Sequence, residues 1–425
     1  MKRVGLIFGS RTVEHEISVT TASKVYEVLR QVQADYEPVL LYINKSGAWL
    51  CGKAVSRLLT VEAEGRTCED LPRRKSLQQS FKQELERLER GTGSGEVEQL
   101  FLPPDPTLRG LCGNPARAGW FRRQLQARLD IAFPVVHGTH GEDGTLQGLF
   151  ELADLPYVGP GVAASAAGMD KILSKLLFRG AGLPTVEATW FTRRQWLTDE
   201  TAVCARVESA LAYPVVVKPA VAGSSVGIGR ATSRPELSQV VRQAMQFSAR
   251  LLVERAVEDR LEVQCAVLGN HDLTVSECEE LLGAGGIVSF EDKYLRRAER
   301  AEEADLAPSH IPARIPEDLA RQVKELAVGA FRTLDARGIS RGSAQHAAVR
   351  QRGQHAARIT LPAPVGAERP HAGRADPPAA RAGRGGPCRE DRHALRIRGG
   401  PGRGGQEAPD EPAEIVRRSM CNVQR

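Results

Sequence analysis

The sequence predicts an α/β (α+β) fold with more than one domain. Short apolar runs alternate with stretches of helical periodicity along most of the chain, a pattern typical of strands packed against helices. A chain of 425 residues is long enough to bury two or three hydrophobic cores. Every Phe, Trp and Tyr lies before Gly342, so we expect these cores in that part of the chain.

The N-terminal part predicts the opening of an α/β domain, which we place at 1–136. An apolar run at 4–8 is followed by a Gly-Ser turn and by a helical pattern from about 18 to 29, and 36–44 supplies the next strand. From about 45 to 129 the sequence is polar, and we interpret it as an insertion to which no chemistry can be assigned.

Two glycine-rich loops follow predicted strands in the middle of the chain. The apolar run at 130–136 leads into a loop that opens with His137, which suits either a pocket rim or a structural histidine bonded to its own loop. Between the two loops, a helical pattern from 165 to 179 predicts a single helix. The run at 213–218 ends in Lys218, and a Gly-Ser-Ser sequence begins at Gly223. A point cation and the backbone N–H groups of such a loop bind phosphate oxygens. This loop therefore predicts a phosphate site, with a surface hairpin as the alternative.

The net charge of +6 comes from the C-terminal part of the chain. The 84 residues after Arg341 contain 15 Arg and no Lys against 8 Asp and Glu, so the preceding part is close to neutral. This removes the main support for a nucleic-acid partner. The eight cysteines include no Cys-x-x-Cys pair, and no apolar stretch approaches the ~20 residues of a membrane helix. We expect a cytoplasmic protein with free thiols and no membrane or nucleic-acid partner.

Several candidate residues are ordinary when they are taken singly. Glu14 follows the first strand, at the end where α/β folds bind ligands, but a solvated glutamate explains it equally simply. Glu254 and Glu262 flank a turn after a predicted strand. The Gly9-Ser10 turn lacks the three-glycine spacing of a dinucleotide site, which argues against an NAD-dependent oxidoreductase.

Read in order, five motifs resemble those of the D-alanine–D-alanine ligase family. They are Phe8-Gly9-Ser10 with Glu14-His15-Glu16, the loop from His137 to Gly148, Met169-Asp170-Lys171, Lys218-Pro219 with Gly223-Ser224-Ser225, and Asp292-Lys293-Tyr294. Their order and spacing over about 340 residues make a far more specific signal than one glycine loop. The chain is identified as a member of the family on this resemblance.

The resemblance implies an ATP-grasp fold, in which two α+β subdomains hold ATP, preceded by a Rossmann-like domain that helps to bind the first D-alanine. The expected divisions are a central subdomain at 137–254, an incomplete C-terminal subdomain at 255–341 and a disordered tail at 342–425. The implied reaction activates one D-alanine as an acyl phosphate, which the amine of a second D-alanine attacks. The product, D-alanyl-D-alanine, is used in peptidoglycan, and the family also implies a homodimer.

The resemblance further implies a role for each matching residue. The residues expected at ATP are Lys171, Lys218 and Lys293 at the phosphates, Ser225 in the glycine–serine loop, Glu254 at the adenine and Glu262 at the ribose. The residues expected at the amino acids are Glu14, Ser224, Tyr294, His137 and Arg341. Glu14 would bind the first ammonium and link through Ser224 to Tyr294, and Arg341 would stabilise the developing oxyanion. Because D-lactate-using relatives replace that tyrosine, we favour the dipeptide over a D-lactate or D-serine product.

The sequence departs from the family pattern after Arg341. In the family an Asp soon follows this arginine, and a Glu-x-Asn comes later; these side chains hold Mg²⁺ (or Mn²⁺). Here Gly342-Ser343-Ala344-Gln345 follows, and the last 84 residues contain no Glu-x-Asn, so no metal ligands are assigned. A shift of one nucleotide within the codons for 349–358 can yield Tyr-Val-Asn-Glu-Val-Asn-Thr-Leu-Pro-Gly. Our hypothesis is therefore a change of reading frame near codon 342.

Three other interpretations stay open. A different ATP-grasp carboxylate–amine ligase would share the lysines and the serine-rich loop, but would not be expected to carry the His137 loop and Lys293-Tyr294 together. An Arg-Gly tail that binds RNA is weakened by the absence of interleaved aromatic residues. The third is a catalytically dead remnant that binds ATP without a metal site.

Overall fold

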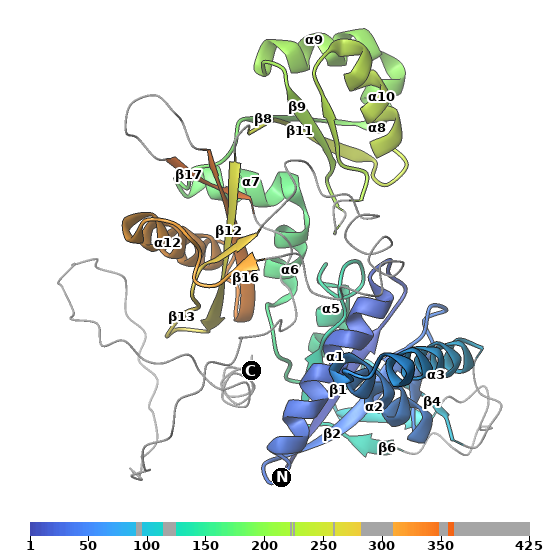
Figure 1. The fold of residues 1–425 in the computed structure, drawn as a ribbon. Helices are drawn as coiled ribbons and strands as arrows, with labels where there is room; N and C mark the ends of the chain where they lie inside the picture. Colours follow the sequence, from blue (N-terminus) through green and yellow to red (C-terminus); the bar gives the residue numbers. More distant parts are fainter. Residues whose placement is uncertain are drawn as a thin grey trace.

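The computed structural model describes residues 1–90, 96–113, 125–221, 223, 226–257, 260–281, 309–347 and 356–360. Its elements form three sheets (Figure 1), with the seven-stranded N-terminal sheet at one end and the four-stranded sheet at the other. The third sheet lies between them. Within the described ranges, no helix is long and apolar enough to cross a membrane.

The N-terminal sheet has the strand order β6-β5-β4-β3-β2-β1-β7. Its strands are β1 (Lys2–Gly9), β2 (Tyr36–Ile43), β3 (Trp49–Cys51), β4 (Glu98–Phe101), β5 (Gly110–Gly113), β6 (Leu125–Arg128) and β7 (Ile131–Pro134). β1 pairs in parallel with β2 and β7, which brings the ends of these strands to one edge of the sheet. The helix between the two parallel strands is α1 (His15–Gln31).

The polar region at 45–129 contributes to this same sheet. It adds β3 to β6 and two helices, α2 (Lys53–Thr67) and α3 (Leu71–Glu89). Leu58 of α2 and Leu88 of α3 are buried in one core with Leu6 of β1 and Val19 of α1. The region expected as an insertion is therefore part of the domain core. Burial of these apolar side chains holds α2 and α3 against the sheet.

The middle helices lead from the N-terminal sheet to the four-stranded one. They are α5 (Thr145–Leu152), α6 (Val162–Met169) and α7 (Lys171–Gly180). The sequence predicts one helix from 165 to 179, and this is wrong. Asp170 has an extended backbone, and its carboxylate accepts hydrogen bonds from the backbone N–H groups of Ile172 and Leu173. It ends α6 and caps a new helix, α7.

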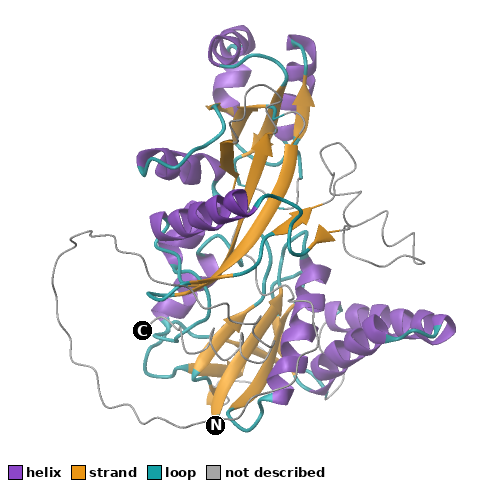
Figure 2. Ribbon diagram, turned by 60° about the vertical axis from the view of Figure 1, so that its left-hand side comes forward, coloured by secondary structure: helices purple, strands orange, loops and turns teal. Residues whose placement is uncertain are grey.

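The four-stranded sheet is antiparallel and has the order β10-β9-β11-β8. Its strands are β8 (Ala188–Thr192), β9 (Val215–Pro219), β10 (Gly229–Ala231) and β11 (Arg250–Arg255), with helices α8 (Arg193–Thr198), α9 (Glu200–Ala210) and α10 (Arg234–Ala244). Val217 and Val253 lie in its core with Val207 of α9 and Val241 of α10. The helices thus cover one face of the sheet, as Figure 2 also shows.

The third sheet has the order β15-β14-β12-β16-β17, and β13 pairs with β12. Its strands are β12 (Arg260–Gly269), β13 (Thr274–Val275), β14 (Glu279–Leu281), β15 (Ser309–His310), β16 (Gly338–Ala347) and β17 (Ala356–Thr360). Val323 and Phe331 of helix α12 (Glu317–Thr333) pack against Val263 and Val267 of β12.

Strand pairing continues beyond Arg341, where the sequence changes character. β16 pairs with β12 as far as Ala347, and β17 pairs with β16. Backbone hydrogen bonds do not require particular side chains, so a strand can continue through a change in composition. The other residues of 342–425, with the disorder expected for them, lie outside the described residues.

Candidate active site

The turn between β1 and α1 is built by Gly9 and Ser10. Both have left-handed φ values, of 90° and 88°. A Cβ on Gly9 would lie 2.2 Å from the carbonyl oxygen of Ile43, so only glycine fits there. The Gly9 N–H donates to Ser18 Oγ over 2.8 Å, and Ser18 Oγ donates to the Val135 carbonyl over 2.7 Å. These bonds fix the first turn of α1 against the carboxyl ends of β1 and β7.

Glu14 precedes α1, and its carboxylate lies between the two glycine-rich loops. A Cβ built on Gly138 would be 2.6 Å from Glu14 Oε2, and one built on Gly223 would be 2.9 Å from the same oxygen. Glu14 is buried, with 9% of its surface exposed. The two loops follow strands of different sheets, β7 and β9, and their glycines allow both backbones to approach one carboxylate. The Glu14 motif and both loops, predicted separately from the sequence, thus meet at one place.

His137 is buried, and its ring is tied to the helix that follows Glu14. Its Nε2 atom lies 2.9 Å from Thr21 Oγ1 in α1. Two hydrogen bonds fix the backbone of the loop that follows His137. The Gly138 N–H donates to Glu142 Oε2 over 2.8 Å, and Gln147 Nε2 donates to the Gly141 carbonyl over 2.8 Å. This contact joins the His137 ring to α1, and the role of His137 stays a prediction.

A second cluster of charges lies where α7 meets the four-stranded sheet. Lys218 is the last residue but one of β9. In the register of β9 with β11 it pairs with Leu252, which places Glu254 two residues further along β11 on the same face. Lys218 Nζ donates to Glu254 Oε2, and Lys175 Nζ lies 2.7 Å from Glu254 Oε1. Glu254 is 3% exposed. Two cations therefore share one buried carboxylate.

The pKa values in this cluster follow from burial and charge. Burial alone would raise the pKa of the Glu254 carboxyl, but Lys218 and Lys175 together lower it to about 2. Lys171, the first residue of α7, is partly buried, and burial together with the charge of Lys218 lowers its pKa to about 8. Positive charge thus exceeds negative charge here, and an anion such as phosphate would be stabilised.

The structure describes only some of the other predicted site residues. Glu262 lies in β12, opposite Leu281 and Gln345. Arg341 lies in β16 opposite Ala266, with its side chain outside the described residues. Ser224, Ser225, Lys293 and Tyr294 lie outside them altogether. Among the residues that the structure describes, no group of three or more His, Cys, Asp and Glu could hold a metal ion.

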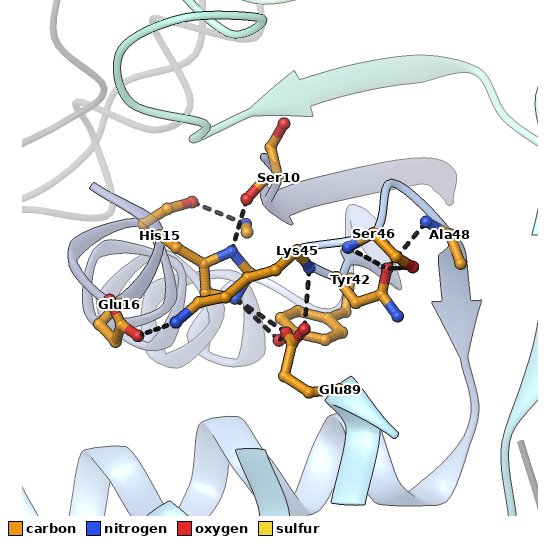
Figure 3. Close-up of polar contacts among 11 residues, drawn as sticks. Ser10, His15, Glu16, Tyr42, Lys45, Ser46, Ala48 and Glu89 are labelled. Carbon is orange, nitrogen blue, oxygen red and sulfur yellow. Dashed lines mark hydrogen bonds and ion pairs between the residues drawn. The ribbon is translucent and has the colours of Figure 1, made fainter. Parts of the chain in front are cut away.

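Sequence reasoning assigned no role to Glu89, the last residue of α3, yet Glu89 supports the start of α1 (Figure 3). His15 is fully buried; its Nδ1–H donates to the Ser10 carbonyl over 2.6 Å, and its Nε2 lies 2.8 Å from Tyr42 Oη and 3.3 Å from Glu89 Oε1. Tyr42 also donates to Glu89, and the Lys45 N–H donates to Glu89 Oε2 over 2.9 Å. Against the opposing effect of burial, the bonds from His15 and Tyr42 lower the pKa of Glu89. No local sequence signal marks a glutamate at the end of a polar helix as part of a site.

Comparisons with known proteins show the family of the chain. The family model "D-ala D-ala ligase N-terminus" matches residues 3–160, and "D-ala D-ala ligase C-terminus" matches residues 177–344. The chain is 34% identical over 340 residues to the D-alanine–D-alanine ligase of Shouchella clausii, covering 80% of this chain and 81% of that protein. The corresponding enzyme of Acetivibrio thermocellus is 34% identical over 343 residues, covering 80% and 82%.

Solved structures give the same result for the fold. The VanG D-Ala:D-Ser ligase of Enterococcus faecalis superposes with a TM-score of 0.65 at 26% identity, covering 86% of this chain and 90% of that one. The D-alanine–D-alanine ligase of Coxiella burnetii gives a TM-score of 0.62 at 23% identity, covering 85% and 84%. These likenesses confirm the ATP-grasp fold that the five motifs imply. The chain belongs to the ATP-dependent D-alanine–D-alanine ligase family.

Proposed function

We propose that this chain carries the active site of a ligase that joins two D-alanines at the expense of ATP, giving D-alanyl-D-alanine for peptidoglycan precursors. The observation that carries the proposal is the Glu14 carboxylate, which lies against Gly138 of one loop and Gly223 of the other. An anionic site for an ammonium group therefore lies beside the loop that follows the lysine-bearing strand β9. A ligase that phosphorylates an amino acid needs this arrangement of opposite charges.

The chemistry follows from the charges. A carboxylate oxygen of the first D-alanine attacks the terminal phosphorus of ATP, and ADP leaves. The amine of the second D-alanine, after losing a proton, attacks the acyl carbon, and phosphate leaves with the former carboxylate oxygen. In our proposal Glu14 binds the first ammonium with His137 nearby, and Lys171 and Lys218 bind phosphate oxygens. Positioning and countercharge are the main sources of catalysis in such transfers.

Further residues complete the proposed site. Lys293 would close over the phosphates and exclude water that would hydrolyse the acyl phosphate. Ser224 and Tyr294 would continue the contact from Glu14, and Arg341 would stabilise the oxyanion. Glu254 and Glu262 would bind the adenine and the ribose, and Ser225 would contribute to the phosphate loop. Their match to the family motifs supports these roles.

The residues present do not fit the Mg²⁺ or Mn²⁺ expected of the family. Magnesium prefers oxygen ligands, chiefly carboxylates and substrate phosphates. The expected Asp, Glu and Asn are absent from the sequence after Arg341, and no metal-binding group occurs among the described residues. We therefore propose no step through a metal in the chain as written.

We propose that the chain changes reading frame near codon 342. The C-terminal family model stops matching at residue 344, and the relatives match about 80% of this chain, which supports a change at this point. The division into domains at 1–136, 137–254, 255–341 and 342–425 belongs to the same proposal, and the end of β11 at Arg255 supports the middle boundary. If the metal stabilises the transition state by about 5 kcal/mol, its loss would slow turnover several thousandfold.

The test is phosphate release by the purified 425-residue chain with ATP, Mg²⁺ and D-alanine, beside a chain with the frame restored after Arg341. We expect turnover only from the restored chain. Turnover by the chain as written would mean that its metal ligands lie elsewhere, and no turnover by either would contradict the ligase. A gene sequence without an alternative frame for Glu-Val-Asn-Thr-Leu-Pro-Gly would refute the frame change.

A second product is favoured by one comparison, because the VanG structure similar to this chain is a D-Ala:D-Ser ligase. Tyr294 argues for the dipeptide of D-alanine, as does the name of the curated relatives. Incubation of the restored chain with D-alanine and an excess of D-serine or D-lactate distinguishes the products by mass. We also propose a homodimer in the cytoplasm, which sedimentation of the restored chain and cell fractionation would test.

A further inference from the structure

Lys175 has no part in the proposed reaction, yet it is buried among the charges of the nucleotide site. We propose that Lys175 is a positioning residue: it holds Glu254 in place so that Lys218 can turn from this carboxylate to a phosphate group of the nucleotide. The inference rests on the proposed ATP site and adds a residue that none of the five motifs assigns.

The contacts of Lys175 fix its ammonium group. Its Nζ donates to the Val186 carbonyl over 2.8 Å and lies 2.7 Å from Glu254 Oε1. Its side chain is 9% exposed, against 4% for Glu254 and 11% for Lys218. The ammonium of Lys175 is therefore confined between a carbonyl and a carboxylate. Among the residues that the structure describes, Lys218 forms its ion pair with Glu254, and no backbone carbonyl there confines its ammonium as Val186 confines that of Lys175.

Helix α7 is itself fastened to the four-stranded sheet, which Figure 1 shows directly above it. The Lys171 N–H donates to the Ala220 carbonyl over 3.0 Å, and Asp170 pairs with Arg250 of β11. Ile172 packs in a small core with Ala220 and Leu252. A helix held in this way gives Lys175 a fixed position relative to Glu254.

The charges explain why a fixed second lysine matters. The ammonium groups of Lys175 and Lys218 both contact the carboxylate of Glu254, and the charge of Glu254 also acts on Lys171. Burial is the main cause that lowers the pKa values of Lys171 and Lys175. If Lys218 moved to a phosphate without Lys175 in place, a buried carboxylate would lose its close partner, which is costly. With Lys175 on Oε1, Glu254 keeps one ion pair and Lys218 is free to move.

The test measures binding of ADP to the full 425-residue chain by calorimetry. We expect Lys175→Met and Lys175→Gln to raise the Kd for ADP at least tenfold, and Lys175→Arg to stay within threefold of the original chain. Adenosine has no phosphate, so Lys218 stays on Glu254 and keeps this carboxylate in place. Adenosine should therefore bind all four chains alike. Lys324→Met is the control, because Lys324 forms an exposed ion pair with Glu277 at 3.1 Å. Circular dichroism checks that each variant is folded.

A double-mutant cycle separates positioning from simple charge. In a Glu254→Gln chain, Lys175→Met should change the Kd for ADP less than twofold, because the contact through which it acts is gone. The same tenfold loss in both backgrounds would mean that Lys175 attracts phosphate at a distance, and the inference would be wrong. It would also be wrong if Lys175→Met bound ADP normally. If neither the original chain nor the frame-restored chain bound ADP, the proposed function would fail and the inference with it.

Discussion

Replacement of Gly138 by alanine tests the central geometry of the site, and the chain offers a matched control. Gly138 and Gly182 have φ values of 72° and 76°. An alanine in this left-handed region costs about 1–2 kcal/mol at either position. Their surroundings differ: a Cβ on Gly138 would lie 2.6 Å from Glu14 Oε2 and 2.8 Å from Thr12 Oγ1, whereas a Cβ on Gly182 would meet nothing within 4 Å.

The size of the expected effect follows from the overlap. Ordinary contact begins at 3.4 Å, so the carboxylate of Glu14 must move by roughly 0.8 Å to admit the methyl group of Gly138→Ala. A misplacement of about 1 Å can cost about 100-fold in rate, which corresponds to about 2.7 kcal/mol of transition-state stabilisation. Gly182→Ala carries the same backbone strain without this displacement.

The assay is kcat/KM for D-alanine in the frame-restored chain, with urea unfolding of both variants in parallel. We expect Gly138→Ala to lose about 100-fold in kcat/KM and Gly182→Ala to lose less than threefold, with similar losses in the free energy of unfolding. The Kd for ADP should be unchanged in both. If the two variants lost equal activity, strain rather than the contact with Glu14 would be the cause, and our reading of the site would be refuted.

Three further predictions concern single residues. Ser10→Gly should raise the free energy of unfolding by about 1 kcal/mol, because Ser10 is a non-glycine residue at a φ of 88°; thermal melting measures the gain, and a loss would contradict the strain. Glu89→Gln should destabilise the chain by about 1–3 kcal/mol and raise KM for D-alanine, because it removes the charge that His15 and Tyr42 contact; unchanged urea unfolding would refute it. The pKa of Glu254 lies at about 2, below its ordinary 4.5, so its contribution to stability, of the order of 3 kcal/mol, is present above pH 4.5 and is lost as the pH falls toward 2. The Glu254→Gln chain should lack this part of the acid dependence, which acid titration of the two chains compares.

The elements predicted well from the sequence are those with a local cause. The first strand is an apolar run closed by Gly9, and Lys218 ends an apolar run, so periodicity locates both. The helix predicted across Asp170 failed because a short apolar pattern continues on both sides of a cap, and only the cap's hydrogen bonds reveal the break. Lys175 and Glu89 could not be predicted, because their partners come from distant parts of the chain and are brought together only by folding.

Strand pairing depends on the backbone and metal binding on particular side chains, and this difference leads to a prediction about the 425-residue chain. β16 keeps its pairing with β12 beyond Arg341, because strand hydrogen bonds tolerate almost any sequence, whereas metal binding requires particular carboxylates at particular positions. A frame change at this point would therefore leave Glu14, Lys171, Lys218 and Glu254 in place while it removes the metal ligands. We expect the 425-residue chain to bind ADP without releasing phosphate from ATP, and frame restoration to recover turnover with little change in the Kd for ADP measured without Mg²⁺. A chain that neither binds ADP nor turns over would show instead that the C-terminal residues are needed to fold the nucleotide site itself.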